Sequence, residues 1–129
     1  STDSTEAAAP GAIALAQRLN TVVAVSGPED FITDGTRVIR VANGDELLTK
    51  VTGGGCALGA LIAAFAAVRG TNSPVEAVAA AHAVYGIAAE QAAAQAAGPG
   101  SFAVSLIDAL STLTPSAVSA EQRIREYAA

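Results

Sequence analysis

The chain has 129 residues, which is about the size of one small domain. Hydrophobic residues make up 51% of it and charged residues 15%, which excludes a disordered segment, and alanine alone fills about a quarter of the positions, which favours helices. The net charge of −5 without a basic cluster argues against nucleic acid as a partner, and neither a secretory leader nor a bilayer-length apolar run is visible, so we expect a soluble, cytoplasmic protein with no membrane partner.

The first third of the chain predicts a helix, a strand and a hairpin. The helix is expected over residues 7–19, with Pro10 in its first turn, where a missing N–H has no partner to lose. Residues 21–25 form a β-branched run that is typical of a strand buried on both faces. Asp34-Gly35 divides residues 31–41 into two arms and predicts a two-residue hairpin turn, because glycine tolerates the positive φ that such turns require.

The rest of the chain predicts four helices. The first spans residues 55–69, and a capping box at Ser73–Glu76 starts a long second helix that reaches about residue 97. A third is expected over residues 101–113, and a short charged helix follows from Ser119. One strand and a hairpin make a poor independent sheet, because edge backbone groups need partners. The pattern therefore predicts part of a layered α/β fold.

Residues 51–58, VTGGGCAL, combine three glycines, the single cysteine and the start of a helix. Glycines turn backbone N–H groups toward a ligand, and the helix dipole adds a positive end, which together favour a phosphate-type anion. The Gly-Lys-Ser/Thr ending of a Walker loop is absent. Cys56 falls in the first helical turn, where the dipole favours a thiolate that can take a proton from a substrate hydroxyl. A flexible loop beside a buried cysteine remains the alternative interpretation.

Other polar residues are weaker candidates. His82 and Tyr85 lie in the long helix among alanines, and we expect His82 to be packed or partly exposed and Tyr85 to be a core or interface residue. We expect Asp30 to be a loop residue in solvent, and the alternative is a place near the end of the first strand at Ser26, where α/β sheets bind ligands. One cysteine and one histidine provide neither metal-ligand spacing nor the third group of a Cys-His hydrolase.

Further motifs accompany the glycine loop in a fixed order. They are Val22–Gly27, Asp30–Gly35, Asn43-Gly44, Tyr85-Gly86 with Ala88–Glu90, and Gly98–Phe102 followed by Leu106–Leu110. With them, residues 1 to about 113 resemble the hydroxyethylthiazole kinase family of thiamine biosynthesis, and the Gly-Pro-Gly-Ser-Phe element makes the resemblance specific. The resemblance implies a ribokinase-like three-layer α/β/α fold. Since family members are about twice this long, it also implies that residues 1–129 are the C-terminal half of one kinase domain whose N-terminal half is absent.

The resemblance also implies an activity and roles for particular residues. The complete enzyme is expected to transfer the γ-phosphoryl group of ATP, with Mg²⁺, to the hydroxyl of 4-methyl-5-(2-hydroxyethyl)thiazole, as a homotrimer. Cys56 is the expected catalytic residue, and Gly54, Gly55 and Cys56 form the expected anion hole. Ser26 is expected to contact ATP and Gly53 to contact the thiazole, with no metal ligand in this chain. Alone, the chain is expected to be inactive.

Two alternatives stay open at the level of sequence. A hydroxymethylpyrimidine phosphate kinase shares the Gly-x-Gly-Cys anion hole, although its C-terminal region usually lacks the Gly-Pro-Gly-Ser-Phe element. A non-catalytic assembly domain, built on the alanine-rich helices, is the alternative if 129 residues are the whole protein.

Overall fold

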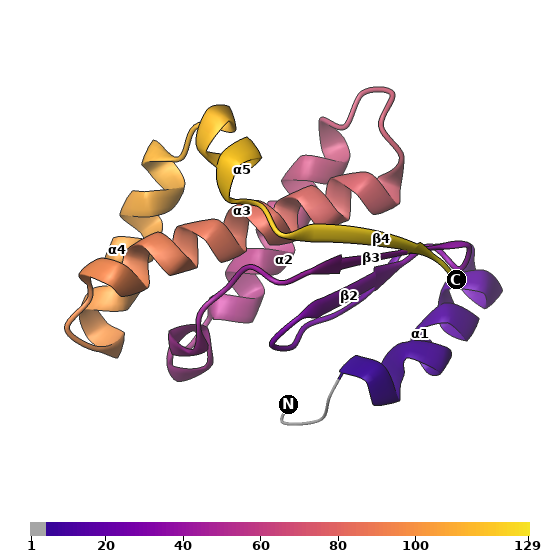
Figure 1. Cartoon of the computed structure of the whole chain (residues 1–129), viewed down its shortest axis with the longest axis horizontal. Coiled ribbons are helices and arrows are strands. Elements are labelled where there is room, and N and C mark those ends of the chain that lie inside the picture. The colour runs from indigo at the N-terminus through magenta and orange to yellow at the C-terminus, as the bar shows by residue number, and fades with distance from the viewer. Residues whose placement is uncertain (1–4) are drawn as a thin grey trace.

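The computed structural model describes residues 5–129, and its helices and strands form three layers (Figure 1). In chain order the elements are α1 (Thr5–Leu19), β1 (Val23–Val25), β2 (Asp30–Thr33), β3 (Arg37–Val41), the 3-10 helix η1 (Glu46–Lys50), α2 (Gly54–Ala67), α3 (Pro74–Gln95), α4 (Pro99–Thr112), α5 (Pro115–Glu121) and β4 (Ile124–Ala128). The α/β class predicted from the sequence is confirmed.

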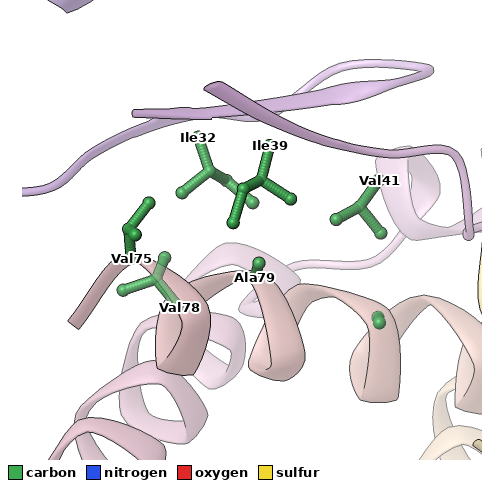
Figure 2. Close-up of a cluster of buried hydrophobic side chains, with 7 residues drawn as sticks. Ile32, Ile39, Val41, Val75, Val78 and Ala79 are labelled. Atoms are coloured by element: carbon green, nitrogen blue, oxygen red, sulfur yellow. The ribbon is translucent and has the colours of Figure 1, made fainter. Parts of the chain in front are cut away.

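Within residues 5–129, the sheet has four strands in the order β1-β2-β3-β4, and every neighbouring pair is antiparallel. Successive residues of a strand face opposite sides, so the sheet has two apolar faces. Ile32 and its cross-strand partner Ile39 pack against α3, as Figure 2 shows, whereas Phe31 and Val38 pack against α1. The sheet therefore lies between α1 on one side and α3 on the other (Figure 1).

Helix α3 is the most buried helix of the structure. A capping box at Ser73 and Glu76 starts it, as the sequence predicts. Its first half contacts the sheet, and its second half packs against α4, where Phe102 is fully buried. Alanines along α3 keep these contacts close, because a side chain of one carbon lets backbones approach. The long alanine-rich segment thus forms the central support of both the sheet and the outer helices.

Two predictions for the sheet need correction. Strand β1 is not buried on both faces: it is an edge strand within the described residues, and Ala24 is exposed. The hairpin is confirmed, but its turn has three residues, Asp34–Thr36, and Gly35 has φ 92°. The physical reason is the side chains: the Asp34 carboxylate accepts from the N–H groups of Thr36 and Arg37, at 2.9 and 2.8 Å, which stabilises the longer turn.

The C-terminal segment also differs from the prediction. Helix α5 begins at Pro115 and ends at Glu121, and the residues expected to continue as a charged helix form β4. Strand β4 extends the sheet because its backbone pairs with the open edge of β3. The local sequence after Ser119 does not indicate this strand, because the edge that β4 completes is distant in sequence. Pro10, expected in a first turn, lies inside α1, which is already helical at Thr5.

The helices differ in their length and apolar character. No single helix within residues 5–129 is both long and apolar enough to cross a membrane, although α4 and α5 taken together pass by length and composition. These two helices are bent by 113° relative to each other.

Candidate functional site

A pocket of about 660 Å³ opens where the end of β1, the turn after β3, the start of α2 and one side of α3 converge. Its lining residues come from segments more than fifty positions apart in sequence. They are Ser26, Gly27, Pro28, Asp30, Asn43, Gly44, Asp45, Glu46, Leu48, Thr49, Gly54, Gly55, Leu58, His82, Tyr85 and Gly86. The pocket thus joins the strand end to the glycine loop, as expected for an α/β ligand site.

The glycine loop has a left-handed backbone conformation at its first position. Gly53 is the N-cap of α2 with φ 87°, a value that side-chain-bearing residues rarely adopt. The first helical bond runs from the Ala57 N–H to the Gly53 carbonyl, so the N–H groups of Gly54, Gly55 and Cys56 precede the helical ladder. Three amides without a helical acceptor and the positive end of the helix dipole are features that favour an anion at a helix start.

A buried tyrosine on α3 is hydrogen-bonded to this helix start. The Tyr85 hydroxyl donates to the Gly54 carbonyl at 2.7 Å, and burial raises the pKa of the Tyr85 phenol. Tyr85 is 4% exposed, so the expectation that it is a core or interface residue is confirmed, and it lines the pocket as well. The hydrogen bond joins α3 to the first residue of α2, and so it anchors the helix start beside the pocket.

The structure brings together some of the predicted site residues. Ser26, Gly54 and Gly55 line the same pocket, although almost thirty residues separate Ser26 from the glycines. Gly53 and Cys56 lie in the adjoining turn but are not among the lining residues. Cys56 is exposed, with a free thiol in the first turn of α2, so the alternative of a buried filler cysteine is wrong.

The Asn43-Gly44 turn, which also lines the pocket, is held by Glu90 and by the C-terminal segment, to which the sequence assigned no role at this site. The Glu90 carboxylate accepts from the Gly44 N–H at 3.1 Å, from the Asn43 side-chain amide and from the Arg123 guanidinium. Asn43, only 5% exposed, also accepts from the Arg123 N–H at 2.7 Å and donates to the Glu121 carbonyl at 3.0 Å. The C-terminal segment thereby holds one wall of the pocket in place.

The Asp30 carboxylate links the first strand end to α3. Its Oδ1 accepts from the Gly27 N–H at 3.0 Å, and its Oδ2 lies 2.9 Å from Nδ1 of His82. His82 is buried, as expected for a packing residue, yet it also lines the pocket. Asp30 lies at the strand-end pocket and not in a solvated loop, and only its position beside Ser26 indicated this in the sequence.

The pocket residues do not form a magnesium site. No three metal-binding side chains come together in the part of the chain from Thr5 onward. Both carboxylate oxygens of Asp30 are occupied by Gly27 and His82, and Asp45 caps η1 by accepting from the Leu47 N–H at 2.9 Å. The donor set of the described residues therefore does not fit a resident Mg²⁺.

Comparisons with known proteins identify the fold and then the family. The structure of a hydroxyethylthiazole kinase protein from Pyrococcus horikoshii OT3 matches with a TM-score of 0.88 and 41% identity, over 95% of this chain and 47% of that one. The fold is therefore a portion of a larger α/β fold. The model of the "HK: Hydroxyethylthiazole kinase family" matches residues 1–116, and the chain belongs to this family.

Curated relatives carry the same family name. A hydroxyethylthiazole kinase of Clavibacter sepedonicus is 54% identical over 123 residues, which are 95% of this chain and 44% of that protein. One from Cereibacter sphaeroides is 50% identical over 124 residues, or 96% of this chain and 46% of that protein. The chain thus spans less than half the length of these relatives.

Proposed function

We propose that the chain is the C-terminal half, residues 1–129, of a ribokinase-like kinase domain that phosphorylates the hydroxyl of 4-methyl-5-(2-hydroxyethyl)thiazole with ATP. One observation carries the proposal: in a member of the hydroxyethylthiazole kinase family, Ser26 and the Gly54-Gly55 helix start line one pocket. A helix N-terminus that faces a strand-end pocket is suited to phosphate groups.

The proposed roles follow from the positions of the residues. The Ser26 hydroxyl contacts ATP from the strand end, and the N–H groups of Gly54, Gly55 and Cys56 donate to the oxygens of the transferring phosphoryl group. The substrate hydroxyl oxygen bonds to the γ-phosphorus while the bond to the β–γ bridging oxygen breaks, and the Cys56 thiolate takes the hydroxyl proton. Gly53 contacts the thiazole from the exposed side of the turn.

The remaining parts of the proposed enzyme lie outside the described residues. Mg²⁺ is proposed to accompany ATP, held by phosphate oxygens and by groups of the other half of the domain, because the residues here do not fit it. The other half is also proposed to complete the thiazole pocket, and the working form is proposed to be a cytoplasmic homotrimer. The chain alone is accordingly proposed to be inactive.

The comparisons do not favour the two alternatives. The relatives named above are hydroxyethylthiazole kinases, and the family model covers residues 1–116, a range that includes the glycine loop. A hydroxymethylpyrimidine phosphate kinase and a non-catalytic assembly domain therefore have no observation of their own to support them.

The test is a phosphorylation assay of a full-length chain that carries these 129 residues, side by side with the 129-residue chain alone. We expect the full-length chain to convert the thiazole alcohol with ATP and to prefer it over the hydroxymethylpyrimidine phosphate. Cys56→Ser should lower kcat by about 100-fold or more, the scale of general-base catalysis. Ala57→Ser is the matched control, since it adds the same hydroxyl one residue later on the exposed face of α2. Unchanged turnover in Cys56→Ser would refute its catalytic role.

A further inference from the structure

We propose that Asp30 and His82 act as a positioning pair that holds the Ser26-Gly27 turn in the geometry that binds the ATP phosphates. The identity of the ligand rests on the proposed function, whereas the pair itself rests on contacts within residues 26–82. Neither residue is assigned to the chemical step. Their proposed contribution is to the affinity for the nucleotide.

The geometry makes Asp30 a bridge between the strand end and α3. One carboxylate oxygen accepts the Gly27 N–H at 3.0 Å, and the other lies 2.9 Å from Nδ1 of His82. An ionised carboxylate only accepts hydrogen bonds, so Nδ1 of His82 must carry a proton. The side chains of His82 and Asp30 are 1% and 13% exposed, so water competes little with either bond.

A buried histidine at position 82 costs more stability than an apolar side chain that fills the same space. Its Nε2 atom is buried and has no hydrogen-bond partner within residues 5–129. An unpartnered buried nitrogen is destabilising, and an apolar side chain on α3 would avoid this loss. The single hydrogen bond that the imidazole makes is the one to Asp30. The imidazole is therefore best explained by its effect on the Asp30 carboxylate.

The Ser26-Gly27 turn is contacted by Thr5 and by the Asp30 carboxylate. On one side, Thr5 lies against Gly27, where an added Cβ would come within 2.7 Å of the Thr5 methyl, and the Thr5 hydroxyl donates to the Glu29 carbonyl at 3.1 Å. The pocket side of the turn is held by the Asp30 carboxylate.

Two substitutions at His82 separate a positioning role from packing. His82→Asn keeps an N–H donor near the position of Nδ1, whereas His82→Leu has similar bulk and no donor. We expect His82→Leu to raise the KM for ATP about tenfold, the effect of one hydrogen bond, with kcat nearly unchanged. His82→Asn should restore most of the affinity. Val75→Ala is the control, because Val75 is fully buried on the same helix but does not line the pocket.

A spectroscopic measurement tests the pair without any activity. His82 is the sole histidine of the 129 residues, so ¹⁵N-histidine labelling gives one imidazole, whose identity the Leu variant confirms. In the wild-type chain we expect a protonated Nδ1 and a Gly27 N–H that exchanges slowly with solvent. In Asp30→Asn we expect the Nδ1 proton to be lost to Nε2, because the new amide can donate to Nδ1, and in His82→Leu we expect faster exchange at Gly27.

These readouts distinguish the two proposals. If the full-length chain phosphorylates no thiazole alcohol, the proposed function fails, while the labelled imidazole and the Gly27 exchange still decide on the pair. The positioning pair is refuted if the wild-type proton resides on Nε2 alone, or if His82→Leu changes the KM for ATP no more than Val75→Ala does.

Discussion

Gly86, in the middle of α3, lies directly against the Asn43-Gly44 turn that forms one wall of the pocket. A Cβ atom at Gly86 would come within 2.6 Å of the Asn43 carbonyl carbon and within 2.7 Å of its Cβ and carbonyl oxygen. Two of these three atoms are backbone, so a side-chain rotation cannot relieve the contact. The substitution Gly86→Ala must therefore move either α3 or the turn.

The Asn43-Gly44 turn has little freedom to move, and this determines how much unfolding free energy Gly86→Ala is expected to cost. Asn43 is held by Glu90, by the Glu121 carbonyl and by the N–H of Arg123. Overpacking of this kind costs about 1–3 kcal/mol, and the greater helix propensity of alanine returns about 1 kcal/mol. Because the clash involves backbone atoms of a clamped residue, we expect Gly86→Ala to lower the free energy of unfolding by about 2 kcal/mol.

Urea denaturation of the wild-type chain and two glycine variants tests this reasoning. Gly59→Ala is the matched control, since Gly59 also lies inside a helix but has no atom within 4 Å of an added Cβ. There the same substitution should stabilise by about 0.5–1 kcal/mol. The two variants are thus expected to differ in sign. If both stabilise the chain, the close approach of α3 to the turn is not a constraint and the reasoning is wrong.

Two further predictions concern hydrogen bonds and charge. Tyr85→Phe removes the 2.7 Å bond to the Gly54 carbonyl, and urea denaturation should show a loss of about 0.5–1.5 kcal/mol; unchanged stability would contradict the anchoring role. The side-chain bond from Arg37 holds the pKa of Glu126 below its ordinary value of 4.5, and the Ser73 N–H followed by Arg37 does the same for Glu76. The stability that these two carboxylates contribute is therefore present above pH 4.5 and is lost as the pH falls through their lowered pKa values. Arg37→Met should flatten the acid end of the plot of unfolding free energy against pH, and a plot identical to that of the wild type would refute the coupling.

The role of the α2 start is visible in the local sequence. Consecutive glycines tolerate a left-handed residue at a helix start, and Gly53 adopts φ 87° at the N-cap of α2. The capping box at Ser73 and the Asp34-Gly35 hairpin were likewise predicted from a few neighbouring residues. Such features depend on side chains that act on their own backbone, so they need no distant partner.

The tertiary structure alone decided which distant groups meet. Strand β4 forms because β3 offers an open edge more than eighty residues earlier in the chain. The Asp30–His82 pair and the Glu90 clamp on the Asn43-Gly44 turn each join residues 46–52 positions apart. A carboxylate accepts equally well from any donor within reach, so composition and periodicity do not specify its partner. The sequence by itself determined the helix start that suits an anion, whereas the packing of α3 determined the walls of the pocket around it.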